Sequence, residues 1–233
     1  MTTQPGRGWF GSKWLKQTIH FADLPSSWRI VQKLQEQETI FLQDDYRSSG
    51  LYSESIGIFL CEEIGTSTPA IMKIRMQVPN TVDDPSSSRT FIQPPEKDIC
   101  GRTSQEIDAL MALTKAECSC TPKYFASKHT NQTPDDWVPG GFLDYIVMEK
   151  MEGVTLSEEY LRELSQREQQ ELRNAFKSSY LECQERRFYH LDASLSNLIW
   201  NKQKMKCYIV DWEARVRKAY SWDDEEYLRW GLL

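Results

Sequence analysis

Short apolar stretches separated by polar turn segments dominate the first part of the chain. Residues 56–61 and 70–76 are mostly apolar, and a turn segment with Gly and Pro over residues 65–69 lies between them. Runs of this length bounded by turn residues are typical of β-strands. A further strand is predicted over residues 39–43, and a polar connection over residues 44–55 follows it. The pattern therefore predicts three antiparallel strands.

The segments on either side of these strands have other patterns. Trp28, Val31 and Leu34 recur at intervals of three residues, which predicts an N-terminal helix within residues 9–37, before the first strand. Residues 77–102 are rich in proline and serine and show no apolar period. Such a segment is predicted to be a mobile insertion.

Periodic segments return after this insertion. A helix is predicted over residues 103–114, because its apolar residues share one face and Thr103 is a suitable N-cap. Two more strands are predicted over residues 123–127 and 145–151, with a loop rich in Pro, Asp and Gly between them.

The C-terminal part of the chain is predicted to be mainly helical. Helices are expected over residues 157–164 and 166–186. The second of these has an apolar stripe at intervals of four, four and three residues, formed by Leu172, Phe176, Tyr180 and Cys183. One more short helix is expected within residues 220–233.

These elements predict an α+β protein with two lobes. The first lobe, residues 39–152, would be an antiparallel sheet that carries the insertion, and residues 1–38 would be an extension in front of it. Residues 153–233 would form a reduced helical C-terminal lobe. The boundary is expected near Gly153, where the strands end and the helices begin.

Composition and charge narrow the functional classes. The chain has 28 Lys and Arg against 34 Asp and Glu, a formal charge of -6, and no basic cluster that could neutralise a run of phosphates. Nucleic acid is therefore not an expected partner. No apolar run approaches the roughly 20 residues that span a bilayer, and no signal-peptide core is visible. A cytoplasmic location without membrane contact is expected.

The six cysteines are expected to be reduced thiols in that compartment. Only Cys118 and Cys120 lie close together in the sequence. Because no second pair of ligands follows at metal-binding spacing, a zinc site is not expected.

The residues with the clearest chemical pattern come after the long predicted helix. His190, Asp192 and Asn197 follow it closely, and Asp211 comes directly after the apolar run over residues 207–210. Phosphoryl transfer from a nucleotide requires carboxylate and amide oxygens on magnesium and a carboxylate that faces the attacking hydroxyl. The alternative is that these residues only cap and turn the chain around a hairpin.

The order and spacing of these residues resemble the catalytic loop and metal-binding motif of the protein-kinase-like superfamily. The form of these motifs is closest to that in aminoglycoside-phosphotransferase-like proteins and compact atypical kinases. In the former, the metal-binding motif can read Asp-Trp-Glu, as it does here from Asp211. The resemblance implies a two-lobed protein-kinase-like fold that uses ATP and Mg²⁺. It makes Asp192 the catalytic base, with His190 bracing the loop from beneath, and it places Asn197 and Asp211 on magnesium.

The same resemblance assigns nucleotide contacts upstream. Lys73, in the predicted strand over residues 70–76, would contact the phosphates. Glu106 would be its carboxylate partner, although Thr103 and Glu106 also fit a capping box at the start of their helix. The backbone from Glu149 to Met151 would form the hinge that receives adenine, with Met148 beside it as gatekeeper.

Several features depart from the family pattern. The connection that should bind phosphates has a single glycine, Gly50, and Ser194 stands where kinases of Ser and Thr usually have lysine. Few residues follow Asp211 to form a substrate-binding lobe. A small-molecule hydroxyl is therefore the expected substrate. The alternatives are an impaired pseudokinase that acts as a binding protein, and a kinase fold used for other chemistry on a small molecule. A homodimer or protein partner could complete the short lobe, through exposed Trp222 and Trp230.

Overall fold

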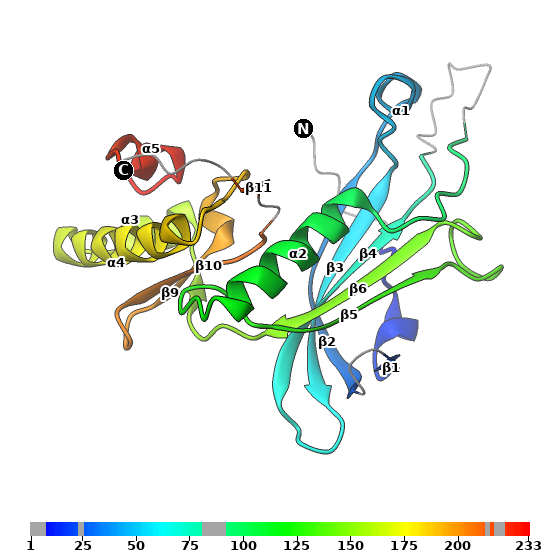
Figure 1. Cartoon of the computed structure of the whole chain (residues 1–233), viewed down its shortest axis with the longest axis horizontal. Coiled ribbons are helices and arrows are strands. Elements are labelled where there is room, and N and C mark those ends of the chain that lie inside the picture. The colour runs from blue at the N-terminus through cyan, green and yellow to red at the C-terminus, as the bar shows by residue number, and fades with distance from the viewer. Residues whose placement is uncertain (1–7, 23–25, 81–91, 213–214, 217–221) are drawn as a thin grey trace. The chain divides into compact units, whose positions relative to one another are not determined.

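A computed structural model describes residues 8–22, 26–80, 92–212, 215–216 and 222–233 (Figure 1). The chain divides into two compact units, and each is described by itself. The sheet unit comprises residues 1–101 and 125–148. The helical unit comprises residues 102–124 and 149–233.

A six-stranded sheet forms the sheet unit, and several of its strands follow the predicted pattern. β2, β3 and β4 pair antiparallel in sequence order, so the apolar runs predicted as strands are strands. The order across the sheet is β1 (Thr18–Phe21), β2 (Ser26–Thr39), β3 (Glu54–Glu63), β4 (Pro69–Gln77), β6 (Phe142–Glu149) and β5 (Tyr124–Asn131).

The predicted N-terminal helix is wrong, because its residues form β2 after one short 3₁₀ turn, η1 (Ser12–Trp14). Register shifts in the β2–β3 pairing leave Val31 and Leu34 without a partner residue on β3. Each is the extra residue of a β-bulge, and both are exposed. The three residues spaced like a helical face do not share an environment, because Trp28 is buried whereas Val31 and Leu34 are exposed. Residues 9–38 thus belong to the sheet unit and are no separate extension.

The connection between β2 and β3 also differs from its prediction. β2 ends at Thr39, so the strand predicted over residues 39–43 is wrong. A short helix, α1 (Gln43–Ser49), lies where a polar loop was predicted. The carboxylate of Asp45 accepts the Leu42 N–H at 2.9 Å, and Gly50 ends the helix at φ 64°, a left-handed conformation that glycine adopts without strain.

Alternation along β4 separates two faces of the sheet. Met72 and Ile74 belong to the hydrophobic core, together with Phe59 of β3. Lys73 and Arg75 point to the opposite face, because successive side chains of a strand alternate. This second face is buried too, and its ionised groups are paired, which burial requires.

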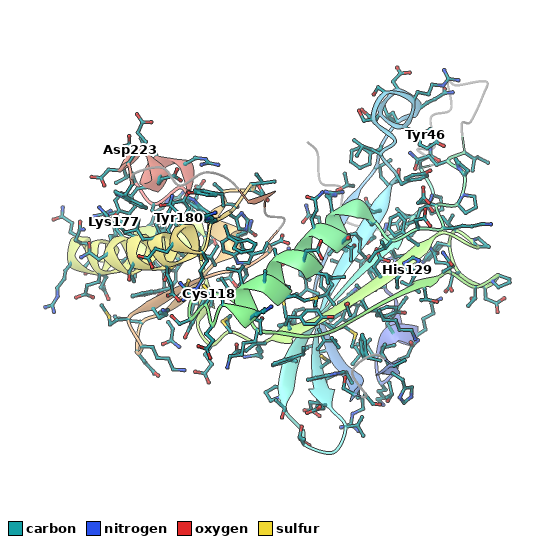
Figure 2. All side chains as sticks on the ribbon, viewed as in Figure 1. Tyr46, Cys118, His129, Lys177, Tyr180 and Asp223 are labelled. Carbon is teal, nitrogen blue, oxygen red and sulfur yellow. The ribbon has the colours of Figure 1, made fainter. Side chains whose placement is uncertain are left out.

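The polar groups on this second face lie at short distances from their partners. Arg75 Nη1 lies 2.7 Å from Glu54 Oε1, and each side chain is only 2% exposed. The carboxylate of Asp144 in β6 accepts the Cys100 N–H at 3.0 Å. Its other oxygen lies 2.6 Å from Nδ1 of His129 in β5. Figure 2 labels the His129 side chain.

Hydrogen bonds connect the described residues of the predicted insertion to β4 and to the residue before β3. Residues 81–91 lie outside the described residues. Before them, the Gln77 side chain donates to Pro94 O and accepts from Glu96 N, both at 2.8 Å. After them, Gln93 is buried, and its Oε1 accepts the Ser53 N–H at 2.8 Å.

The helical unit contains the predicted helices and three short strand pairings. The Ser165 side chain caps α4 and accepts from the Glu168 N–H, and the predicted apolar stripe of α4 is buried. β7, β9 and β10 form one sheet, and β8 and β11 pair separately. The elements are α2 (Gly101–Lys115), β7 (Val154–Thr155), α3 (Glu158–Glu163), α4 (Gln166–Glu185), β8 (Phe188–Tyr189), η2 (Leu195–Asn197), β9 (Leu198–Asn201), β10 (Lys206–Ile209), β11 (Arg215–Val216) and α5 (Glu225–Arg229).

The start of α2 corrects one of the capping predictions. The helix begins at Gly101, so Thr103 lies inside it and is not its N-cap. Thr103 Oγ1 is buried and makes no hydrogen bond to a described residue. The capping box between Thr103 and Glu106 is therefore wrong. Within the described ranges, no helix is long and apolar enough to cross a membrane.

Candidate active site

The loop between β8 and β9 carries the predicted catalytic residues. It leaves β8 at Tyr189, and its end is shaped by η2. Ser194 is the N-cap of η2, where its side chain accepts from the Ser196 N–H. The Asn197 N–H donates to Ser194 O at 3.1 Å, which closes the turn and directs the chain into β9.

His190 joins this loop to the end of β10. Its Nδ1 accepts the Asp192 N–H at 3.2 Å, and its Nε2 lies 2.8 Å from the Val210 carbonyl. A carbonyl can only accept, so we assign the neutral tautomer with the proton on Nε2. Burial lowers the pKa of His190, against the opposing effect of the Val210 carbonyl and of Asp211 and Asp192. A neutral imidazole that holds two backbone groups positions the loop.

Aromatic rings enclose this imidazole. The ring centroids of Trp212 and Trp230 each lie 5.1 Å from that of His190. Trp230 is only 1% exposed, and it also packs against Phe176 of α4. The prediction that Trp230 is exposed for a partner is therefore wrong, since it belongs to the interior of the helical unit. Trp222 is half-buried and packs against Phe176 as well.

Asn197 makes a second link between the same segments. Its Nδ2 donates to Asp192 O at 2.9 Å and lies 3.4 Å from Asp192 Oδ2. Its backbone carbonyl accepts the Val210 N–H at 2.9 Å. Because Nδ2 is engaged with Asp192, Oδ1 is the atom that the Asn197 amide can offer to a cation.

Asp211 follows Val210 in a left-handed backbone conformation, with φ 63°. Asp and Asn are the non-glycine residues that tolerate this region best, and strained backbone of this kind is concentrated at functional sites. The turn is fixed by the next residue, because Trp212 Nε1 donates to Ile209 O at 2.8 Å. Asp211 is half-buried.

The helical unit thus contains three side chains with oxygen atoms on backbone segments joined by hydrogen bonds. They are Asp192, Asn197 and Asp211. Val210 binds His190 and Asn197 through its carbonyl and its N–H respectively, and both of those residues bind Asp192. Carboxylate and amide oxygens are the ligands that Mg²⁺ prefers. Asp192 is exposed, so its carboxylate is accessible to a substrate hydroxyl.

The state of His190 predicts a pH dependence of stability. The folded pKa is lowered below the unfolded value of about 6.5. The stabilisation is therefore fully present above about pH 6.5, and it is lost as the pH falls through the folded pKa. We expect the free energy of unfolding to decrease as the pH falls from about 6.5 to the folded pKa of His190. His190→Gln should make the free energy of unfolding less dependent on pH, because glutamine keeps an N–H donor but does not titrate.

Chemical denaturation between pH 7.5 and pH 5 would measure this slope. The matched control is His20→Gln, which changes an exposed histidine of the sheet unit. An unchanged slope in His190→Gln would show that His190 is not the titrating group.

The predicted nucleotide contacts lie in both units. Lys73 is on β4 in the sheet unit, and Glu106 is on α2 in the helical unit; both are buried. Their pairing remains a prediction. At the predicted hinge, the Glu149 N–H donates to Lys123 O at 2.8 Å, so this amide is engaged within the protein. Met151 is half-buried, and its contact with adenine also remains a prediction.

One cluster of side chains was missed by the sequence reasoning. Cys183 of α4 lies beside Cys118 and Cys120, although 63 residues separate it from Cys120. The close spacing of the first two was the available signal. A partner so distant in the sequence could not be assigned from that spacing.

Comparisons with known proteins give no family. No protein-family model matches the chain, and no curated protein matches it. Among solved structures, the kinase PK-1 of Cydia pomonella granulovirus matches with a TM-score of 0.46 and 13% sequence identity, over 81% of this chain and 52% of that one. The chain thus spans about half the length of that kinase. A likeness this distant shows neither a family nor an activity.

Proposed function

We propose that this protein is a phosphotransferase that uses ATP and Mg²⁺ to phosphorylate a hydroxyl group of a small molecule. The observation that carries the proposal is the double link of Val210 to His190 and Asn197. These bonds hold the backbone beside Asp211 to the loop that presents Asp192. The Asp211 backbone and the exposed Asp192 carboxylate are thereby linked within one unit, and this supports the proposal that Asp211 binds the metal.

The proposed roles follow from the chemistry of phosphoryl transfer. Asn197 Oδ1 and the Asp211 carboxylate would hold magnesium, which neutralises charge on the nucleotide phosphates. Asp192 would accept the proton of the substrate hydroxyl as that oxygen attacks the γ-phosphorus and the bond to ADP breaks. His190 would hold the loop in place through its bonds to Val210 and Asp192.

A second candidate function is favoured by the connection between β2 and β3. This segment forms α1, where a phosphate-binding loop was expected. The Leu42 N–H donates to Asp45 and the Ser53 N–H donates to Gln93, so these amides are engaged within the protein. A kinase-like protein that binds partners and does not transfer phosphate fits this observation.

Thermal unfolding with nucleotide separates the two functions. Ligand at about one hundred times its Kd stabilises the folded state by about 2.7 kcal/mol, which corresponds to a rise in Tm of about 5–10 °C for a chain of this size. We expect ATP with Mg²⁺ to give such a rise, and ATP with a chelator to give much less.

Asp211→Asn should remove the magnesium-dependent part of the rise. Asparagine tolerates the left-handed backbone of this position but lacks the charge. The control is Asp108→Asn, which changes an exposed carboxylate of α2 in the same unit. No rise in the wild-type protein at millimolar ATP and Mg²⁺ would refute the phosphotransferase and favour the binding protein.

A further inference from the structure

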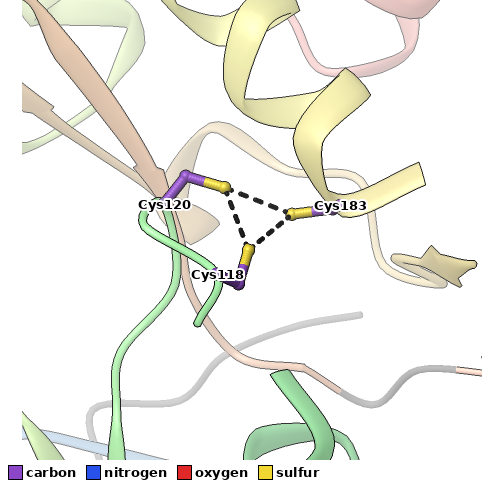
Figure 3. Close-up of side chains that lie close together, drawn as sticks. All are labelled: Cys118, Cys120 and Cys183. Carbon is purple, nitrogen blue, oxygen red and sulfur yellow. Dashed lines mark hydrogen bonds between the residues drawn. The ribbon is translucent and has the colours of Figure 1, made fainter. Parts of the chain in front are cut away.

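Three cysteine side chains meet in the interior of the helical unit (Figure 3). Cys118 and Cys120 come from the loop after α2, and Cys183 comes from the last turns of α4. The sulfur of Cys120 lies 3.4 Å from that of Cys118 and 3.4 Å from that of Cys183, and the third distance is 3.9 Å. All three residues are buried.

These distances suit three ligands of one metal ion. Zinc binds thiolate sulfur at about 2.3 Å with tetrahedral geometry, which places two ligand sulfurs about 3.8 Å apart. The observed range of 3.4–3.9 Å brackets that value. It is far longer than a disulfide bond of about 2.05 Å. Among the described residues, this is the one group of three or more His, Cys, Asp or Glu side chains that could hold a metal ion.

A polar shell fixes the Cys118–Cys120 loop against α4. The Glu182 carboxylate accepts from the Ser119 N–H at 2.6 Å and from Ser119 Oγ at 2.7 Å. Lys206 Nζ donates to Ser119 Oγ at 2.7 Å and lies 3.4 Å from Glu182. Hydrogen bonds of this kind, from groups around a site, orient its ligands.

The thiols already interact with one another. Cys120 Sγ lies within hydrogen-bond distance, 3.4 Å, of both Cys118 Sγ and Cys183 Sγ. Cys120 Sγ also donates to the Ser179 carbonyl at 3.2 Å. All three sulfurs are buried, so thiolates formed among them would require a neighbouring cation to offset their lost hydration. A metal ion at the centre of the three sulfurs would be that cation.

We propose that Cys118, Cys120 and Cys183 bind one thiophilic metal ion, Zn²⁺ or Cu⁺. Both ions favour thiolate ligands. The thiols that are protonated release their protons to solvent as the metal–sulfur bonds form, and no group is oxidised or reduced. Three sulfurs suffice for Cu⁺, whereas Zn²⁺ would take a small donor such as water as its fourth ligand.

The site would stabilise the strand that leads to Asp211. The Cys120 carbonyl accepts the Ile209 N–H of β10 at 2.9 Å, and Ile209 lies two residues before Asp211. A metal ion that fixes Cys120 to α4 therefore also fixes the end of β10. The metal site does not depend on the proposed phosphotransferase function, because its residues contact no nucleotide in that proposal.

Elemental analysis of the full chain tests the proposal. The protein would be purified with a non-thiol reductant, exposed to Zn²⁺ or to Cu⁺, and freed of loose metal. We expect a single equivalent of metal per chain, and the loss of most of it in Cys183→Ser. The control is Cys100→Ser, which changes a half-exposed thiol of the sheet unit and should keep the full equivalent.

Two measurements on the wild-type protein keep the test decisive if Cys183→Ser does not fold. X-ray absorption should give a shell of three sulfurs, at about 2.3 Å from zinc, and a chelator should lower the Tm until metal is restored. The relative occupancy by Zn²⁺ and Cu⁺ identifies the ion. Metal content well below one equivalent, or a disulfide among these cysteines in place of metal, would overturn the proposal.

Discussion

Asp192→Asn is expected to lower the rate of phosphoryl transfer by about a hundredfold to ten-thousandfold, the usual contribution of a general base. The substitution removes the group that accepts the proton and keeps the shape of the side chain. An amide oxygen can still accept from Asn197 Nδ2, as Asp192 Oδ2 does at 3.4 Å. We therefore expect the affinity for ATP and Mg²⁺ to change little.

ATP hydrolysis, with water as the acceptor hydroxyl, measures this rate without knowledge of the substrate. Asp108→Asn serves as the control, since it removes an exposed carboxylate on α2 and should leave the rate unchanged. If Asp192→Asn hydrolyses ATP as fast as the wild type, Asp192 is not the base.

Glu54→Ala is expected to destabilise the sheet unit by about 3–5 kcal/mol, the usual effect of removing one partner of a buried ion pair. Glu54 and Arg75 are 2.7 Å apart and almost wholly buried. The second carboxylate oxygen lies 3.6 Å from Cys100 Sγ, so the substitution removes that contact too. Chemical denaturation, followed by a probe in the sheet unit, would measure the change.

A matched pair on the same strand gives the control. Glu62 of β3 pairs with Arg29 at 3.1 Å, but both side chains are substantially exposed to solvent. Exposed pairs contribute about 0–1 kcal/mol, so Glu62→Ala should change the stability little. Equal effects of the two substitutions would contradict the importance assigned to burial of the Glu54 pair.

Elements with a simple period could be predicted from the sequence. The apolar runs of β3 and β4 and the long stripe of α4 each follow one local pattern, and the structure has these elements with small shifts of their ends. β2 could not be predicted in this way. Its bulges at Val31 and Leu34 arise from pairing with β3, which no local pattern records.

In the candidate site, too, the spacing of neighbouring residues could be predicted, whereas contacts between segments distant in the sequence could not. The spacing of His190, Asp192 and Asn197 was visible, and it placed them in one loop. Their links to Val210 depend on how β10 lies beside that loop. The burial of Trp230 and the approach of Cys183 to Cys120 likewise depend on tertiary packing, so sequence spacing gave no sign of either.

The central claim is that Asp211 and the loop residue Asn197 bind the magnesium of a nucleotide. The most direct test is the affinity for ATP, measured by calorimetry with Mg²⁺ and with a chelator, in the wild type and in Asp211→Asn. We predict that Mg²⁺ strengthens binding in the wild type and has little effect in the variant. An equal effect of Mg²⁺ on both proteins, or no binding of ATP to the wild type, would contradict the claim.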